Sequence, residues 1–394
     1  MRIGIVAPEF PPDIGGVETY AYEFSTELAR RGHDVFVFTL PHVNRGKSAQ
    51  GFEVLPELKV QYASDRLLPR TYTMDVWHVM NAAYAWLALE TQPVVVSVHG
   101  NDFINPYFLP KSRPLPHVPG LWRFQSQLDS WPTVLWPRWA RRMMWRGLTQ
   151  ARQVIANSQY TRSLLIQRVP RCLAHTSVGY VGVGDDFLHV RRHHCKSDSP
   201  KKLVTVCRLA EPRKNVSKVL RALAGLKRHP FEFTVVGDGP VRPKLELLCR
   251  QLDLADRVHF TGFISKTEIQ QHLASSDLFV LTSGVLPDSI EGFGIVYLEA
   301  NACGTPVLAA RAAGAAEAVV EGKTGFFVDE PSVPAITEAL ERFLEGDVHF
   351  ESTDCKAFAK HFTWARVVDH ALQYYYPAAD KKSLVRRRWK FPIA

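Results

Sequence analysis

Two glutamates separated by a glycine-containing segment, Glu291 and Glu299, are the residues of this chain best suited to chemistry. Gly292 and Gly294 suit a loop, and the apolar run from Ile295 favours a helix that begins there. Free N–H groups at the start of such a helix attract an anion such as a diphosphate. The eight positions between the glutamates amount to about two helical turns, so the carboxylates can reach different hydroxyls. A sugar nucleotide carries both kinds of group.

A pair of cations, Arg208 and Lys214, brackets the loop between a predicted strand at 203–206 and the helix that follows it. Arginine gives a forked contact and lysine a point charge. Both could therefore converge on one diphosphate and balance its charge as it departs. Arg213 lies between these two cations and has no assigned role. The alternative is that all three are ordinary solvated surface residues.

Two further segments follow predicted buried strands near the N-terminus. Gly15 and Gly16 come after a strand at 3–7 and precede a helix from Val17, so their backbone could approach an anion closely. His99 follows a strand at 94–98, at the carboxyl edge where open α/β sheets bind ligands. The alternatives are a tight turn without a ligand and a histidine satisfied within the sheet edge.

The order of elements predicts two α/β domains. Strand, glycine-containing loop, helix and strand alternate from residue 3 onward, as in a doubly wound sheet. The segment 190–200 is polar and basic and has no apolar periodicity, so it is predicted to link the domains. Alternation then restarts, with predicted strands at 203–206, 233–236, 258–260, 278–281, 307–309 and 326–328.

These motifs, in this order, resemble those of the retaining family-4 glycosyltransferases (glycosyl transferases group 1), which have the GT-B fold. The resemblance covers most of the chain and is most specific between Arg208 and Glu299. It implies an α/β fold of two Rossmann-like domains with parallel sheets that face an interdomain cleft. The implied parts are an acceptor-binding domain at 1–184, a nucleotide-sugar-binding domain at 200–362, and a helix at 363–394 that crosses back to the first domain and ends in a basic tail.

The resemblance also implies roles for individual residues. Those implied to be catalytic lie beside the transferred sugar or the diphosphate: His99, Arg208, Lys214 and Glu291. Those implied to bind substrate, with Glu299 on the ribose and Asp102 in a supporting or acceptor role, are Gly15, Gly16, Asp102, Gly237, Phe263, Ile264, Phe293, Gly294, Ile295 and Glu299.

The implied reaction moves a hexose from a GDP- or UDP-sugar to an acceptor hydroxyl, with retention at the anomeric carbon. No metal and no other cofactor is expected, because no Asp-x-Asp motif occurs and the adjacent His193-His194-Cys195 is a poor metal site. The acceptors implied by the family include lipid-linked saccharides and precursors of polysaccharide or lipopolysaccharide in the cell envelope. The sequence does not identify the sugar, the base, the acceptor or the oligomeric state.

Charge and composition bear on partners and location. The net charge of +9 favours anionic partners, but no nucleic-acid-binding motif is present. No apolar run is long enough for a membrane span, and Glu9 and Asp13 interrupt the N-terminus too early for a signal peptide. Six scattered cysteines suggest neither disulfides nor zinc. A cytoplasmic protein, peripheral on the inner face of the membrane, is expected.

Two basic and aromatic segments make an anionic membrane surface a candidate partner. Five of the nine tryptophans alternate with arginines between 121 and 147, and the tail at 381–390 is similarly basic. The segment at 121–147 could equally pack internally or line an acceptor site. Two other functions remain open: a GT-B enzyme that acts on a free sugar phosphate, and a non-catalytic basic surface-binding protein on the same scaffold.

Overall fold

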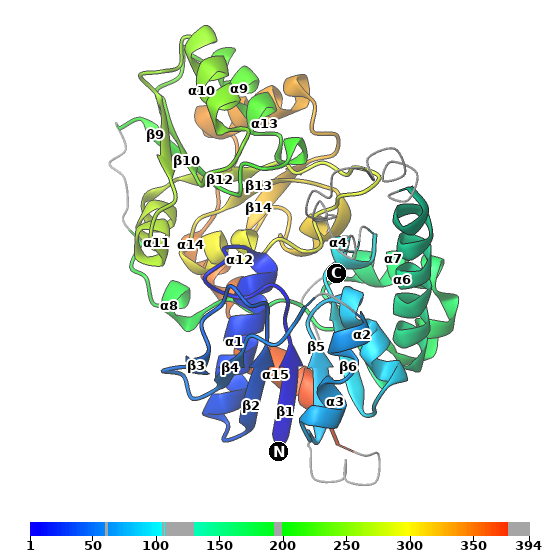
Figure 1. The fold of residues 1–394 in the computed structure, drawn as a ribbon. Coiled ribbons are helices and arrows are strands. Elements are labelled where there is room, and N and C mark those ends of the chain that lie inside the picture. The colour runs from blue at the N-terminus through cyan, green and yellow to red at the C-terminus, as the bar shows by residue number, and fades with distance from the viewer. Residues whose placement is uncertain (60–61, 105, 107–129, 193–198, 377–394) are drawn as a thin grey trace. The chain divides into compact units, whose positions relative to one another are not determined.

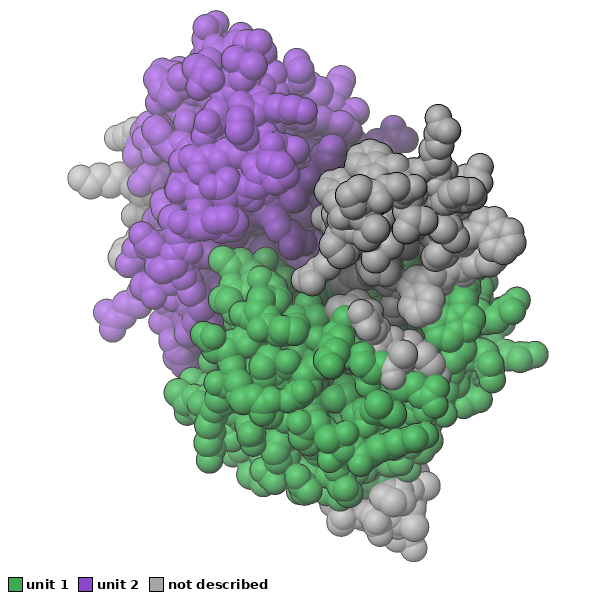
Figure 2. Space-filling view, viewed as in Figure 1, with its two compact units in different colours: residues 1–179, 368–385 green, residues 180–367, 386–394 purple. Residues whose placement is uncertain are grey.

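The computed structural model describes residues 1–394 except 60–61, 105, 107–129, 193–198 and 377–394 (Figure 1). The predicted linker therefore lies partly, and the basic tail entirely, outside the described residues. The chain divides into two compact units (Figure 2). Unit 1 comprises Met1–Gly179 and the described part of Val368–Val385, and unit 2 comprises Tyr180–Val367 in its described part.

Unit 1 is built on an eight-stranded sheet in the order β3-β4-β2-β1-β5-β6-β7-β8, parallel except for the β3–β4 pair. The central strands β5 and β6 are buried along their whole length and are mostly apolar, because both faces of the sheet are covered. The strands are β1 Arg2–Val6, β2 Asp34–Phe38, β3 Gly46–Lys47, β4 Glu53–Leu55, β5 Val76–Val79, β6 Val94–Val98, β7 Gln153–Ala156 and β8 Thr176–Val178.

The helical segments of unit 1 connect these strands (Figure 1). They are α1 Gly16–Arg30, α2 Tyr62–Asp65, α3 Leu68–Thr71, η1 Ala82–Leu89, α4 Asn101–Ile104, α6 Ser130–Gln150, α7 Gln159–Arg168 and η2 Pro170–His175. The long helix α6 lies directly on η1, where a Cβ at Gly147 would come within 2.1 Å of the Ala85 carbonyl oxygen. Only glycine permits this close approach.

Unit 2 contains a six-stranded, wholly parallel sheet in the order β11-β10-β9-β12-β13-β14. Its strands are β9 Lys201–Val206, β10 Phe231–Val236, β11 Val258–Gly262, β12 Leu278–Leu281, β13 Val307–Ala310 and β14 Gly325–Val328. All six predicted strands are present. The prediction of two Rossmann-like domains with parallel sheets is therefore confirmed, and each unit accounts for one of them.

The helices of unit 2 follow the same alternation. They are α8 Asp185–Leu188, η3 Pro212–Lys214, α9 Val216–Ala224, α10 Arg242–Gln251, α11 Lys266–Ser275, α12 Ile295–Ala302, η4 Ala313–Glu317, α13 Val333–Glu345, α14 Ser352–Ala359 and α15 Trp364–Leu372. Local sequence fixes several ends. Ser265 and Glu268 form a capping box at the start of α11, and Gly346 ends α13 with a φ of 86°. Helix α15 begins in unit 2 and ends in unit 1.

Candidate active site

The sheet of unit 2 reverses its direction of winding between two neighbouring strands, β9 and β12. In open α/β sheets, ligands bind at the carboxyl ends of the strands on either side of such a reversal. The loop after β9 contains Arg208 and Lys214, and the loop after β12 leads to Glu291. The fold therefore brings three of the predicted catalytic residues to the place where it is best able to bind a ligand.

A buried charge cluster forms around the carboxylate of Glu291, which is only 9% exposed. Its Oε2 accepts hydrogen bonds from Lys214 Nζ at 2.6 Å, Arg213 Nη1 at 3.0 Å and Ser283 Oγ at 3.0 Å. Burial alone would raise the pKa of Glu291, but the charges and hydrogen bonds of Lys214 and Arg213 lower it to about 2. Glu291 is therefore ionised at neutral pH. Among the described residues, none donates to its second oxygen, Oε1.

Arg213 connects two acidic side chains and a serine. Besides Glu291, its Nε donates to Glu211 Oε2 at 2.7 Å and to Ser289 Oγ at 2.8 Å, while Ser289 Oγ donates to Glu211 at 2.6 Å. The side chain is 5% exposed, so its charge depends on these partners rather than on water. A lysine could not make the same set of contacts, because only the planar guanidinium offers several fixed donors.

Backbone contacts hold the two loops together. Asn215 adopts a left-handed conformation (φ 56°) and donates from Nδ2 to the Thr282 carbonyl at 2.6 Å. The N–H of Gly284 donates to the Arg213 carbonyl at 2.7 Å. On the far side of Glu291, Gly314 N–H donates to the Glu291 carbonyl at 3.0 Å. A Cβ at Gly314 would lie 1.8 Å from the Gly292 carbonyl oxygen, so a larger residue there would displace the Glu291 loop.

The predicted start of a helix after Glu291 is present. Gly294 precedes α12 with a φ of 84°, and a Cβ on it would lie 2.5 Å from the ring of Tyr297. Ile295 is the first helical residue, and Glu299 lies one turn further along and is half-buried. The ring of Phe293 packs against the rings of Tyr180 and Phe362, so only its backbone is placed to contact a ligand.

The remaining predicted residues of unit 2 occupy the ends of β9, β10 and β11. Arg208 is exposed and forms no ion pair with any described carboxylate. Gly237 has a φ of 125°, and a Cβ there would lie 2.1 Å from the Cys207 carbonyl oxygen, which requires glycine. Phe263 follows β11 and is 61% exposed, whereas Ile264 is half-buried. Such an exposed ring is available for stacking against a planar group.

Unit 1 brings together its two predicted polar residues after β6. Asp102 is buried and accepts hydrogen bonds from the backbone N–H groups of His99 at 3.0 Å and Ala82 at 2.8 Å. Burial raises the pKa of Asp102 to about 6, against the lowering effect of these bonds. Burial lowers the pKa of His99 to about 4, against a hydrogen bond to the Met80 backbone, so the ring is neutral at pH 7.

The glycine loop of unit 1 has an anionic neighbour of its own. Gly16 begins α1 as predicted, and Gly15 precedes it. The carboxylate of Glu18 folds over Gly15, where a Cβ would lie 2.3 Å from its Oε2. A negative side chain is favourable at a helix N-terminus. Any external anion that bound here would have to displace Glu18.

Several residues of these sites were not assigned by the sequence. The sequence indicates no role for Arg213, and Ser283, Ser289 and Gly314 belong to no recognisable motif. Their importance arises from contacts between segments far apart in the chain, for example between Arg213 and Glu291, which are 78 positions apart.

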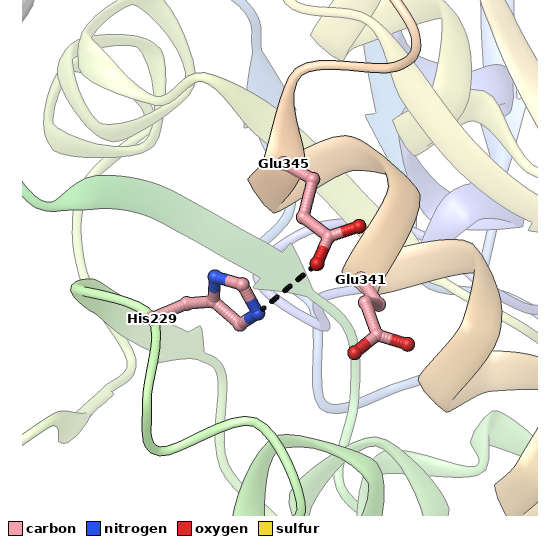
Figure 3. A group of neighbouring side chains, drawn as sticks. All are labelled: His229, Glu341 and Glu345. Carbon is pink, nitrogen blue, oxygen red and sulfur yellow. Dashed lines mark ion pairs between the residues drawn. The ribbon is translucent and has the colours of Figure 1, made fainter.

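A second cluster with metal-binding chemistry lies at the surface of unit 2, formed by His229 before β10 and by Glu341 and Glu345 on α13 (Figure 3). His229 Nε2 lies 3.8 Å from Glu345. Arg228 pairs with both glutamates and donates from Nε to His229 Nε2 at 3.1 Å. Because the Arg228 guanidinium already contacts the atoms that would bind a metal, we assign no metal to this cluster.

Comparison with known families accounts for both units. The family described as Glycosyltransferase Family 4 matches residues 14–185, and that described as Glycosyl transferases group 1 matches residues 189–361. The chain is 30% identical over 372 residues to a GDP-mannose-dependent alpha-(1-6)-phosphatidylinositol monomannoside mannosyltransferase of Mycolicibacterium smegmatis, covering 86% of this chain and 88% of that protein. The chain therefore belongs to the family-4 glycosyltransferases, and its activity is glycosyl transfer.

Two further comparisons agree. An alpha-monoglucosyldiacylglycerol synthase of Streptococcus pneumoniae is 24% identical over 339 residues, which is 78% of this chain and 71% of that protein. The structure of a sucrose-phosphate synthase from Thermosynechococcus elongatus superimposes with a TM-score of 0.73 at 19% identity, covering 95% of this chain and 98% of that one. The latter establishes the GT-B fold.

Proposed function

We propose that this protein transfers a hexose, with retention of configuration, from a nucleotide sugar to a hydroxyl of a lipid-linked acceptor. The observation that carries this proposal is the cluster of Lys214, Arg213 and Glu291 at the reversal of the unit 2 sheet. GDP-mannose is the first donor to test, because the mannosyltransferase relative is GDP-mannose-dependent. A UDP-sugar is the alternative donor. The names of two relatives, one acting on a phosphatidylinositol mannoside and one making a glucosyldiacylglycerol, support a lipid acceptor.

The proposed chemistry places charge stabilisation in unit 2. Arg208 and Lys214 would balance the negative charge on the departing diphosphate, with the N–H groups at the start of α12 contributing. The bond from the anomeric carbon to the diphosphate oxygen breaks, and the acceptor oxygen forms its bond on the same face. The acceptor's proton passes to the diphosphate. Glu291 would hold sugar hydroxyls through Oε1, because its Oε2 is engaged by the protein.

The remaining assignments follow the same proposal. His99 and Asp102 would lie beside the transferred sugar, Glu299 would hold the ribose, and the turns at Gly237 and at Phe263-Ile264 would contact the base. Gly15 and Gly16 would border the reaction centre. No metal or cofactor is proposed.

The first experiment is a thermal-shift measurement against GDP, UDP, GDP-mannose and UDP-glucose, repeated with EDTA. A ligand that binds the folded state raises the melting temperature by mass action. We expect one nucleotide series to raise it, and the shift to persist in EDTA. A shift that EDTA abolishes would contradict metal independence. No shift with any nucleotide would favour the non-catalytic alternative. Hydrolysis products formed without any glycoside acceptor would favour the GT-B enzyme that acts on a free sugar phosphate.

A peripheral membrane location is part of this proposal, and helix α6 supports it. Arg138, Arg141, Arg142 and Arg146 are exposed, as are Trp139 (38%) and Trp145 (36%). Helix α6 contains no acidic residue, and in its described part the opposite side is buried at Ala140, Met144 and Leu148. Arginine and tryptophan on one exposed helical face suit an anionic lipid surface. The side chains of Trp131 and Trp136, and all of Trp122, lie outside the described part of the chain. No helix among the described residues has the length and hydropathy of a membrane span.

Sedimentation with vesicles of anionic or zwitterionic phospholipid tests this location. We expect binding to anionic vesicles that weakens with salt, and a loss of roughly tenfold or more for R141E/R142E. The matched control R168E/R171E makes the same charge change at exposed arginines of unit 1 outside α6. Equal loss in both variants would indicate a general charge effect. Binding to nucleic acid but not to vesicles would overturn the membrane assignment.

A further inference from the structure

Two strands of unit 1 end side by side, and each is followed by a polar side chain. In the parallel pair of β6 and β7, Val98 lies opposite Ala156, so His99 and Asn157 are the next residues on either strand. The N–H of Asn157 donates to the Val98 carbonyl at 3.2 Å, which continues the pairing past the strand ends. The two side chains therefore belong to one edge of the sheet, at the place where this fold class binds ligands.

Each of these side chains has one buried polar atom that has no hydrogen-bond partner among the described residues. The atoms are His99 Nε2 and Asn157 Oδ1. Asn157 is only 6% exposed. Most buried polar atoms in folded proteins are paired, because an unpaired one forfeits its bond to water without a replacement. Two such unpaired atoms at neighbouring strand ends therefore destabilise the unit, and a ligand that donated hydrogen bonds to them would remove this free-energy cost.

The hydrogen bonds around these atoms define both as acceptors. Asn157 Nδ2 donates to the His99 carbonyl at 3.4 Å, which leaves Oδ1 as the free end of the amide. His99 uses its other ring nitrogen on the Met80 backbone, and burial keeps the ring neutral at pH 7. Its Nε2 therefore carries a lone pair and no proton. The edge presents two acceptors, which suits hydroxyl donors and disfavours phosphate or carboxylate.

Contacts on both the backbone and the ring restrain His99. Its backbone N–H donates to Asp102, its carbonyl accepts from Asn157, and its ring meets the edge of Tyr20 with centroids 4.8 Å apart. Tyr20 is in turn buried beside Ser97. The contact with Tyr20 and the hydrogen bond to the Met80 backbone thus restrain the imidazole before any ligand arrives, which favours specific binding.

We propose that Asn157 is a second sugar-binding side chain, whose Oδ1 accepts a hydrogen bond from a hydroxyl next to the one that binds His99 Nε2. This inference rests on the proposed function, because the sugar is the one being transferred. It adds a specificity element: a hexose that lacks either hydroxyl would leave a buried acceptor unpaired. Sites built in this way discriminate strongly against the deoxy analogue.

A cycle of enzyme variants and donor analogues tests the proposal. The probes are GDP-mannose, or the nucleotide sugar that the thermal-shift panel selects, and its monodeoxy analogues. The enzymes are the parent, N157A, N157D and the control Q153A, and kcat/KM is measured for each pair. Gln153 lies at the opposite end of β7 and bonds to Ser177, so its loss perturbs the unit without touching this edge.

We expect one deoxy analogue to lose roughly 10- to 100-fold in kcat/KM with the parent enzyme, and this penalty to disappear in N157A. Penalties at other positions should remain. N157D retains an oxygen acceptor and should restore part of the discrimination. Q153A should preserve the parent pattern.

Two outcomes overturn the inference. If N157A lowers kcat/KM by the same factor for every donor, Asn157 only positions His99 and does not contact the sugar. If N157A retains every deoxy penalty of the parent, Oδ1 does not contact the sugar. Failure of the proposed function is distinguishable, because the parent enzyme would then transfer no sugar at all. If N157A does not fold, as judged by its melting temperature, loss of the discrimination in folded N157D would decide against an acceptor role.

Discussion

The two units place opposite kinds of polar group at corresponding edges of similar sheets. In unit 2, Glu291 is buried yet ionised, because two cations and a hydroxyl contact it. In unit 1, burial favours the neutral forms of His99 and Asp102, because each meets backbone groups rather than an opposite charge. The same physical effect, desolvation, therefore gives different results according to the partners supplied. One edge suits a charged leaving group, and the other suits hydroxyls.

The largest effect should come from removing Arg213. R213M would remove the cation shared by Glu211 and Glu291 and leave Glu291 with Lys214 alone, and buried pairs broken in this way cost about 3–5 kcal/mol. We expect the free energy of unfolding, measured by urea denaturation, to fall by that order. The double variant R213M/E211Q should recover part of the loss, because it removes one unpaired charge. No recovery would mean that Glu211 and Arg213 are not coupled.

The next effect concerns Lys214. In K214A we expect turnover to fall by about 10²–10³, the usual cost of removing one group that stabilises developing charge. The melting temperature should change far less, because Arg213 still contacts Glu291. K244A removes an exposed lysine of unit 2 and should retain its activity. Near-parental turnover in K214A would refute the diphosphate assignment.

A smaller effect should follow from G314A. The added Cβ would overlap the Gly292 carbonyl, and overpacking of this kind costs about 1–3 kcal/mol. We expect KM for the donor to rise as well, since the Glu291 loop must shift. G225A adds the same methyl group where the closest contact is 3.4 Å, so it serves as the control. Equal stability of the two variants would show that the loop yields without strain.

The smallest effect is a pH dependence of opposite sign in the two units. The pKa of Glu291 is lowered on folding, so its contribution to stability is present above about pH 4.5 and is lost as the pH falls towards 2. The pKa of Asp102 is raised, so its contribution is present below about pH 4 and is lost as the pH rises through 6. Urea denaturation between pH 3 and 7 should show a steeper acid loss in D102N than in E291Q. The reverse order would contradict the assigned directions.

The sequence predicted most of the fold because strands and helices leave local patterns. The apolar runs of β9 to β14 and the glycines at the ends of helices are visible in short windows. The motifs also predicted that Lys214 and Glu291 belong to one site. The contact between them was not predictable, because a diphosphate was expected to take the lysine, whereas here the lysine contacts the carboxylate.

What the sequence could not disclose depends on burial and on contacts across the sheet. Asn157 and Gly314 occupy unremarkable sequence contexts, and their roles appear only when β7 lies beside β6 and η4 lies against the Glu291 loop. The shifted pKa values of His99 and Asp102 have the same origin, since desolvation is a property of the packed structure. Sequence patterns locate candidate groups, but the partners that fix their charge come from elsewhere in the chain.

The division of α15 between the units has a consequence for synthesis. The described residues of unit 2 all lie between Tyr180 and Val367, whereas unit 1 also includes residues after Val367. Tyr375 completes it, because its hydroxyl meets His78 Nδ1 at 2.5 Å inside the first sheet. During synthesis, the strands of unit 1 therefore emerge well before the residues around Tyr375 that complete the unit, although domains usually fold in the order of their synthesis. Unit 2, although synthesised after the strands of unit 1, can therefore be the first of the two units to reach its final structure.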